Sequence, residues 1–493
     1  MKETMYLIDG AFPEGSPEEE GISSRDIAAY IDALRAMDYD LHSLQIVRHG
    51  KRVFAKATEP YTLQSPHRLL SAAKSIIAAA VLFVIDDGKL RFEDKVADFF
   101  SEYLPDNPCK EVLQLTVYDL LTMQTGQDTD DAFMHFLTHP DEDLCRAFFV
   151  TPFTGQPGTH FFYNNAVPHL LFTLVERATG RKYAEYLNEK LCSPLGIRIT
   201  AQYNNVGIYD PVTTVVSAED FMKLGVWFLQ EGAWEGKQLL DPSLIRMAMA
   251  QQVCTNSEDI VSRGYGMQIW RNFFGGACMN GGGVQLAMIV PEQDMVFTIT
   301  SNETRGHEAI MLAYEKVISR VRGRAMLADP EGERLLQQAA ATMNRAPVGQ
   351  AEISGCRQWE GEYRFAANDY GLETMSFHRA DAKYMLCINN TQVEIGLYGV
   401  WKPAEKHILV KPDLSIQNRI YETDPQHCMF SGGWQAENRF VFTLKSLGSM
   451  GEYRFCLTFD QQRVTLQIPR HVSVGAQDET NVDILSANRQ IPC

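Results

Sequence analysis

The spacing of hydrophobic residues near the start of the chain changes from a helical to a strand pattern. Ser23 and Asp26 have the spacing of a capping box and predict the start of a helix. Apolar residues then recur at helical intervals: Ile27, Tyr30, Ile31 and Leu34. Two short apolar runs, 44–47 and 53–55, flank the His49-Gly50 turn and predict a β-hairpin.

Downstream, helical patterns separate this hairpin from a second pair of strands. Residues 71–85 (SAAKSIIAAAVLFVI) are apolar around most of the helix circumference, which predicts a helix buried between two layers. The pattern is mostly helical with long loops over 90–260, and strand patterns return at Gln285–Val290 and Met295–Thr300. A helix is expected from 308 to 321. Strands that bracket a helical insertion predict an α+β sheet domain with an all-helical subdomain beside it.

The pattern changes again after residue 325. Residues 326–354 are polar, alanine-rich and end in a Pro-containing stretch, so we expect a linker helix there. Within 355–493, turn signals separate short alternating runs: Trp359–Phe365, Glu373–His378, Tyr384–Ile388, His407–Val410, Arg439–Leu444, Tyr453–Phe459 and Val464–Ile468. This spacing predicts an all-β, barrel-like or sandwich domain. We therefore divide the chain into a domain of residues 1–325, the linker helix and an all-β accessory domain.

Composition narrows the class of protein. With 45 Lys+Arg against 62 Asp+Glu, the net charge is −17, so the chain lacks the excess of cations that would release counterions from nucleic acid. No apolar stretch approaches the roughly 18 residues of a membrane-spanning helix, and no secretory signal precedes the first helix. Ten scattered cysteines without a CxxC pair are typical of reduced thiols. We expect a cytoplasmic protein that binds neither nucleic acid nor membranes.

The first candidate catalytic residues lie in the one S-x-x-K sequence of the chain, Ser71-Ala72-Ala73-Lys74. Ser71 and Lys74 are one helical turn apart and share a face. A serine hydroxyl is a weak nucleophile that needs a base, and burial disfavours the charged form of a lysine, so Lys74 can be that base or its partner. The helix N-terminus favours negative charge developing beside Ser71. The alternative is a capping serine and a lysine that extends to solvent.

A Y-x-N triplet supplies candidate partners. It runs from Tyr163 to Asn165 and precedes a predicted apolar helix. A tyrosine near Lys74 can share a proton, and the Asn165 amide can orient both the lysine and a substrate carbonyl. Further Y-x-N triplets start at Tyr186, which falls within a helical pattern, and at Tyr203, which lacks a following apolar helix. Tyr163 is therefore preferred.

A glycine-rich segment, Met279-Asn280-Gly281-Gly282-Gly283, leads into the strand that begins at Gln285. Glycines at a strand edge let a substrate approach the backbone closely, so Met279, Asn280 and Gly281 are candidate substrate-binding residues. A backbone N–H of this segment, together with that of Ser71, can form an oxyanion hole. A flexible hairpin loop is the alternative.

The ordered set of S-x-x-K, Y-x-N and a glycine-ending triad before a strand resembles the serine β-lactamase and penicillin-binding-protein-like hydrolases. The resemblance is closest to the class C β-lactamase and esterase branch, and it extends over about residues 20–322. Further segments resemble family landmarks in the same order: Leu44–Lys51, Ile85–Leu90, Thr116–Gly126, Pro194–Ile197, Ser217–Gly225, Gly264–Trp270 and Pro291–Val296. Each is loose by itself, but their order and spacing together are specific. The resemblance implies the β-lactamase-like fold, an antiparallel sheet flanked by helices with an all-helical subdomain.

The resemblance also implies roles for these residues. Ser71 would be the acylated nucleophile and Lys74 its proton partner, with Tyr163 as general base and Asn165 as the orienting amide. Gly282 would supply the second oxyanion N–H. Which of Lys74 and Tyr163 takes the proton stays open, because coupled groups titrate as a unit. No metal or cofactor is implied. The β-domain resembles accessory barrels of some family members, and we expect it to roof the site or to mediate homodimer formation.

One position departs from the family. The glycine-ending triad usually opens with Lys or His, and in members that process β-lactams the lysine helps to hold the substrate's carboxylate. Met279 has neither a charge nor a donor and favours a neutral acyl group. We therefore expect a small ester, amide or peptide as substrate, D-amino-acid peptides included. A true β-lactamase and a catalytically silent, penicillin-recognising binding or sensor protein are the alternatives.

Overall fold

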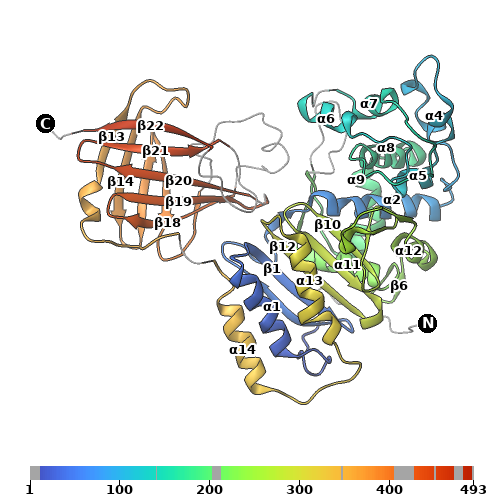
Figure 1. Ribbon diagram of the computed structural model, residues 1–493, viewed down its shortest axis with the longest axis horizontal. Coiled ribbons are helices and arrows are strands. Elements are labelled where there is room, and N and C mark those ends of the chain that lie inside the picture. The colour runs from blue at the N-terminus through green and yellow to red at the C-terminus, as the bar shows by residue number, and fades with distance from the viewer. Residues whose placement is uncertain are drawn as a thin grey trace.

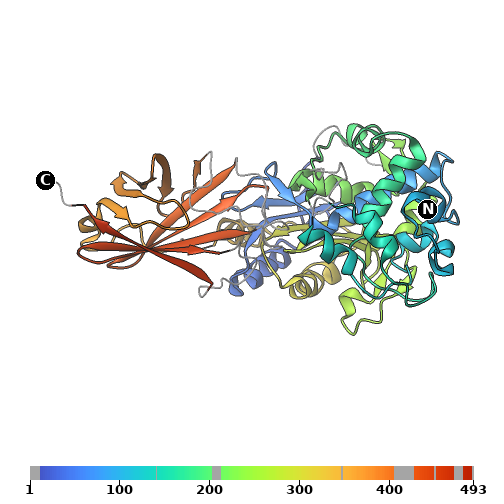
Figure 2. The ribbon, with the colours of Figure 1, turned by 90° about the horizontal axis from the view of Figure 1, so that it is seen from above.

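The computed structural model contains a mixed helix-and-sheet unit and a β-barrel, which lie next to each other along the long axis of the molecule (Figure 1, Figure 2). This arrangement confirms the predicted fold class of an α+β unit with an all-helical subdomain and a C-terminal all-β domain. The described residues are 12–139, 142–201, 213–345, 348–404, 427–448, 451–470 and 481–490.

The central sheet of the first unit joins strands from both ends of its sequence. Its order is β2-β1-β12-β11-β10-β9-β8-β7. The strands are β1 (Leu41–Arg48), β2 (Lys51–Ala57), β7 (Val253–Cys254), β8 (Gly264–Tyr265), β9 (Trp270–Arg271), β10 (Ala277–Gly281), β11 (Gln285–Val290) and β12 (Met295–Ser301). The predicted β1–β2 hairpin is confirmed, and both of its turn residues, His49 and Gly50, have positive φ, as a tight hairpin turn requires.

Helices cover both faces of this sheet (Figure 1). On one face α1 (Ser24–Ala36), α13 (Gly306–Lys316) and α14 (Pro330–Ala341) share a hydrophobic cluster with the strands. The segment predicted to be a linker therefore contains a helix that packs on α1, where Arg25 pairs with Asp329 at 2.6 Å. On the other face lie α2 (Lys74–Asp86) and α11 (Ala218–Leu229).

The apolar helix α2 lies between this sheet and the helical subdomain. It is buried on all sides, as predicted, because α8 (Val167–Thr179) packs against it from the subdomain. The other subdomain and connecting helices are α3 (Val96–Phe99), α4 (Lys110–Gln114), α5 (Val117–Leu121), α6 (Asp131–Thr138), α7 (Leu144–Val150), α9 (Tyr183–Leu187), α10 (Ser193–Leu195) and α12 (Pro242–Met249). The two-layer burial places the start of α2 where the sheet and the subdomain meet.

Local details differ from the predictions at two helix starts. Ser23 makes no side-chain cap on α1, and the Asp26 N–H donates to the Ser23 carbonyl at 3.0 Å instead. The helix expected from residue 71 begins as a 3-10 turn, Leu70–Ala73, and becomes α-helical only at Lys74.

The C-terminal domain is a closed barrel with its own hydrophobic cluster. Nine of its ten strands form the ring, because β16 at one end of the sheet also pairs with β18. Its strands are β13 (Gly361–Phe365), β14 (Thr374–Ala380), β15 (Lys383–Ile388), β16 (Thr391–Gly396), β17 (Lys402–Ala404), β18 (Cys428–Ala436), β19 (Arg439–Ser446), β20 (Glu452–Phe459), β21 (Arg463–Pro469) and β22 (Val482–Arg489). The predicted run His407–Val410 lies outside the described residues.

Two further features concern the described residues as a whole. Within the described ranges, none of the helices has the length and apolar character needed to cross a bilayer. The described cysteines are all free thiols.

Candidate active site

The turn of residues 69–73 carries Ser71, the candidate nucleophile, and we call it the nucleophile turn. It connects a short ribbon of two strands to α2. Strand β3 (Pro66–Arg68) pairs with β4 (Val215–Ser217), and the Leu69 N–H donates to the Thr214 carbonyl at 2.9 Å. Leu70 then takes a φ of 46°, in the left-handed region that a leucine rarely adopts. Such backbone strain persists where the surroundings enforce it, and it is concentrated at functional sites. The turn leaves Ser71 partly exposed between buried neighbours.

The side chains of Ser71 and Asn165 both contact Lys74. Lys74 Nζ lies 2.8 Å from Ser71 Oγ and 3.0 Å from Asn165 Oδ1. Lys74 is 4% exposed, so this ammonium or amine contacts protein groups rather than bulk water. The 3-10 turn continues directly into α2, and the three-residue spacing therefore still places Ser71 and Lys74 on one face. The structure brings together the serine, lysine and asparagine that the motifs predicted.

Asp130 is a further residue of the site that the motifs did not reveal. Its carboxylate accepts both the Asn165 backbone N–H and the Asn165 Nδ2 amide, each at 2.7 Å. Because the amide nitrogen of Asn165 faces this carboxylate, its oxygen is directed at Lys74. Asp130 directly precedes α6, 35 residues before Asn165 in the chain, and no motif links the two positions.

Tyr163 contacts Lys74 through its ring. The Lys74 Nζ lies 4.8 Å from the ring centroid, and the same ring stacks on Trp270 with centroids 5.6 Å apart. Tyr265 meets the Tyr163 ring edge-on at 6.2 Å. Burial raises the pKa of Tyr265 well above its ordinary value, and nearby Tyr163 adds to this shift. Among the described residues, the Tyr163 hydroxyl donates to neither Ser71 nor Lys74, so its role as general base stays a prediction.

The glycine segment lies against the nucleophile turn. A Cβ on Gly281 would come within 2.0 Å of the Leu69 carbonyl oxygen, and one on Gly282 within 2.8 Å of the Leu70 side chain. Glycine is therefore required at the point where β10 contacts the turn that carries Ser71. This contact places the backbone of Gly281 and Gly282 next to the start of α2.

Met279 is fully buried in the cluster that surrounds α2, whereas Asn280 is partly exposed. The methionine presents no accessible surface to a ligand, so its predicted contact with substrate finds no support in this geometry. Its sulfur-containing side chain still occupies the position at which the family usually has a cation.

The other Y-x-N triplets do not join this site in the described residues. Tyr186 on α9 is buried, and its hydroxyl donates to Asp87 at 3.0 Å. Tyr203 lies outside the described ranges. Within those ranges, no group of three or more His, Cys, Asp or Glu side chains is arranged to hold a metal ion.

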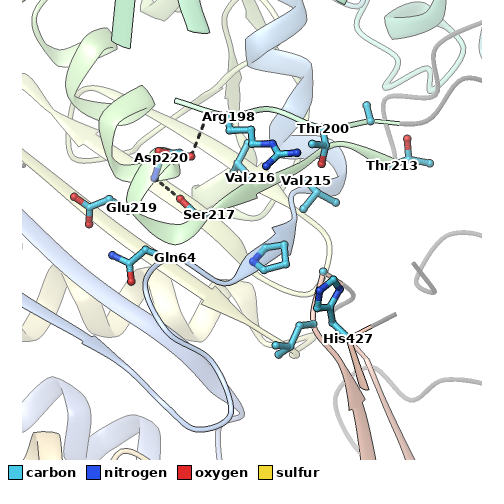
Figure 3. A pocket seen from close by; sticks show the side chains of 14 residues that line it. Gln64, Arg198, Thr200, Thr213, Val215, Val216, Ser217, Glu219, Asp220 and His427 are labelled. Carbon is cyan, nitrogen blue, oxygen red and sulfur yellow. Dashed lines mark hydrogen bonds between the residues drawn. The ribbon is translucent and has the colours of Figure 1, made fainter. Parts of the chain in front are cut away.

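A cavity of about 670 Å³ lies beside the β3–β4 ribbon (Figure 3). Figure 3 shows side chains from β4 and the start of α11, among them Ser217 and Asp220, on one side and His427 on the other. Two lining residues, Thr213 and Val215, flank Thr214, which bonds to Leu69 of the nucleophile turn. The catalytic candidates themselves do not line this cavity, so it is a neighbour of the site rather than the site.

Comparison with known proteins finds relatives that are named as hydrolases. The chain is 24% identical over 159 residues to a D-aminopeptidase of Brucella anthropi, which covers 31% of this chain and 29% of that protein. It is 26% identical over 218 residues to esterase EstB of Burkholderia gladioli, covering 37% and 53%. It is also 26% identical over 225 residues to a 6-aminohexanoate-dimer hydrolase of Paenarthrobacter ureafaciens, covering 42% and 56%. The matches thus span between 29% and 56% of the length of these relatives.

A solved structure with a similar fold also carries a hydrolase name. A solved Bacillus anthracis protein, provisionally named a 6-aminohexanoate-dimer hydrolase, superposes with a TM-score of 0.50 at 19% identity, over 63% of this chain and 89% of that one. At this identity the likeness concerns the fold alone. The Beta-lactamase family model matches residues 30–318, which is more than half of the 493 residues. The chain therefore belongs to the beta-lactamase family.

Proposed function

We propose that this protein is a serine hydrolase that cleaves an ester or amide through an acyl-enzyme on Ser71. The observation that carries the proposal is the contact between Lys74 Nζ and both Ser71 Oγ, at 2.8 Å, and Asn165 Oδ1, at 3.0 Å. A serine within hydrogen-bond reach of a base that is itself oriented by a third group is the arrangement of an activated nucleophile.

The proposed reaction has two stages. Ser71 Oγ attacks the substrate carbonyl while its proton passes to the pair of Lys74 and Tyr163. The backbone N–H groups of Ser71 and Gly282 stabilise the oxyanion of the tetrahedral intermediate. The same pair returns the proton to the leaving alcohol or amine. Water then attacks the acyl-enzyme, and the acid is released as Ser71 regains its proton.

The substrate class follows from the buried Met279 and from the relatives. With methionine in place of a lysine or histidine, this position offers no ion pair to a substrate carboxylate. A neutral acyl group is therefore favoured over the free carboxylate of a β-lactam. The D-aminopeptidase, esterase and 6-aminohexanoate-dimer hydrolase among the relatives agree with an ester or amide, D-amino-acid peptides included.

The experiment compares two serines of one helix region. A fluorophosphonate probe should label the wild-type protein and Ser75→Ala, but not Ser71→Ala. Ser75 is a matched control because it is buried and donates to the Gln268 carbonyl at 2.8 Å, away from Lys74 Nζ. Hydrolysis of p-nitrophenyl acetate should fall by about a thousandfold or more in Ser71→Ala, as expected for loss of a covalent nucleophile.

Three outcomes bear on the alternatives. Absence of both labelling and turnover in the wild-type protein would favour a silent binding protein. Labelling that survives in Ser71→Ala would place the nucleophile elsewhere. Turnover of nitrocefin faster than that of p-nitrophenyl acetate and D-alanine p-nitroanilide would contradict the substrate argument from Met279.

A further inference from the structure

A buried glutamine holds the loop of residues 282–284 that joins β10 to β11, which we call the glycine loop. Gln285, the first residue of β11, is fully buried. Its Nε2 amide donates to the carbonyl oxygens of Ser301 at 2.7 Å and Gly283 at 2.9 Å, and lies 3.3 Å from that of Gly282. Its Oε1 accepts the Ser301 N–H at 3.4 Å. One side chain therefore ties the glycine loop to the neighbouring strand β12.

Other groups reinforce the same attachment. The Ser301 hydroxyl donates to the Gly283 carbonyl at 2.8 Å and lies 3.2 Å from that of Val284. The Glu303 N–H also donates to the Gly283 carbonyl, at 3.2 Å. A carbonyl oxygen has two lone pairs, yet that of Gly283 is approached by three donors. The loop conformation is thus enforced from β12 and the residues just after it.

This enforcement has a visible consequence in the backbone. Gly283 has a φ of 69° and Val284 a φ of 63°. The left-handed region is costly for a β-branched residue such as valine, and it persists only where surrounding contacts overdetermine it. The hydrogen bonds from Gln285 and Ser301 supply those contacts.

The N–H of Gly282 lies between two anchored points. On its N-terminal side, Gly281 packs so closely on the Leu69 carbonyl that a Cβ would come within 2.0 Å. On its C-terminal side, the carbonyls of Gly282 and Gly283 face the Gln285 amide. Fixing the backbone on both sides of the Gly282 peptide fixes the direction of its N–H.

The same glutamine also contacts the segment that leads to Ser71. Burial lowers the pKa of His67 on β3, four residues before Ser71, well below its ordinary value, and the neighbouring Gln285 side chain acts in the opposite direction. His67 is 2% exposed and lies edge-on to His42 at 5.2 Å. Gln285 therefore joins the two chain segments that carry the candidate oxyanion donors, those of Ser71 and Gly282.

We propose that Gln285 is a positioning residue that sets the geometry of the oxyanion hole, an inference that rests on the proposed function of Ser71. Gln285 touches neither substrate nor the reacting atoms. Its effect is to hold the Gly282 N–H at the distance and angle that a developing oxyanion needs. Removal of its amide should therefore weaken stabilisation of the transition state more than it weakens substrate binding.

The first test uses Gln285→Met, which keeps the length of the side chain and removes its donors. With p-nitrophenyl acetate, kcat should fall by about 10- to 100-fold while KM changes by less than about threefold. The matched control is Gln45→Met on β1. Gln45 is fully buried in the same sheet, but its amide donates to the Ala218 carbonyl at 2.7 Å, away from the glycine loop. Its kcat should stay within about twofold of the wild type.

The second test uses Gln285→Glu, whose protonated carboxyl retains one donor. Its kcat relative to wild type should fall as the pH rises, because the ionised carboxylate cannot donate to the loop carbonyls. A wild-type kcat in a folded Gln285→Met, or a pH-independent ratio for Gln285→Glu, would overturn the inference. An equal loss of kcat in Gln45→Met would also overturn it, since this loss would reflect general loosening. A failure of the proposed function would appear separately, as a wild-type protein that is neither labelled nor active.

Discussion

At the scale of single residues, Asp130 fixes the orientation of the Asn165 side-chain amide. Its two carboxylate oxygens each accept one N–H from Asn165, at 2.7 Å. Hydrogen bonds to an ionised acceptor are stronger than neutral ones, so this pair holds the amide oxygen toward Lys74 more firmly than a neutral partner would.

We therefore expect Asp130→Asn to lower kcat for p-nitrophenyl acetate by about 10-fold or more, because hydrogen bonds to charged groups contribute about 1.5–3 kcal/mol. Asp128→Asn is the matched control, since Asp128 lies in the same loop and bonds to Thr154 and His160 instead. Its kcat should be unchanged. A parallel loss in both variants would show that the loop, rather than the Asp130–Asn165 contact, controls activity.

At the scale of elements, β10 and the nucleophile turn are in contact through a glycine. Gly281→Ala would place a methyl group 2.0 Å from the Leu69 carbonyl oxygen, so either the strand or the turn must move. We expect loss of fluorophosphonate labelling at Ser71 and a lower melting temperature. Gly323→Ala is the control, because nothing lies within 4 Å of the methyl group that it adds. Wild-type labelling rates in Gly281→Ala would contradict the proposed contact.

The buried histidine on β1 makes stability depend on pH. Burial lowers the pKa of His42 to about 4, although the nearby Asp40 acts in the opposite direction. Its ring stacks on Tyr61 with centroids 4.0 Å apart. In the unfolded chain a histidine titrates near 6.5, so between about pH 4 and 6.5 the unfolded state binds more protons than the folded state. The stability that folding gains by keeping His42 neutral is complete above about pH 6.5 and is lost as the pH falls toward 4.

His42→Phe should therefore flatten the decline of stability with acid. The free energy of unfolding, measured in urea at several pH values from 4.5 to 7, should fall less steeply with acid than in the wild type. The difference in slope should approach about 1.4 kcal/mol per pH unit, the value for one proton. Equal slopes in the two proteins would show that His42 does not carry this dependence.

At the scale of the whole molecule, a buried ion pair joins the barrel to the helix-and-sheet unit. Lys445 Nζ on β19 lies 3.0 Å from Asp40 Oδ1, and both side chains are 6% exposed. Burial raises the pKa of Asp40, but Lys445, His42 and Arg345 together more than offset this and hold the pKa below its ordinary value. Arg345 and Glu452 lie within 3.8 Å of this pair and extend it to a network.

Removal of one partner should destabilise the chain strongly. Lys445→Met leaves the Asp40 carboxylate buried without its nearest cation, and the free energy of unfolding should fall by about 3–5 kcal/mol. The double variant Lys445→Met/Asp40→Asn should lose less than Lys445→Met alone. Lys383→Met, which breaks the more exposed pair with Glu394, should cost no more than about 1 kcal/mol. A loss in Lys445→Met as small as this control would mean that the pair does not stabilise the docked barrel.

Local periodicity explains which features could be predicted from the sequence. The S-x-x-K spacing implies one helical turn between Ser71 and Lys74, and their side chains meet at 2.8 Å. The continuous apolar run of α2 implies burial on all sides, and the His49-Gly50 turn implies the hairpin of β1 and β2. The signals for these features lie in residues a few positions apart, so the spacing of residues along the chain is enough to predict them.

Other features depended on contacts between distant segments. Asp130 reaches Asn165, Gln285 reaches Ser301 and His67, and α14 packs on α1 only after the sheet and its helices have assembled. The hydrophobic periodicity of the sequence does not predict such pairs, because they are set by strand order and helix packing rather than by the spacing of residues along the chain. The sequence by itself determined the residue types of the site and the elements that carry them. The tertiary structure alone decided which residues orient that site, since burial and direction arise from packing.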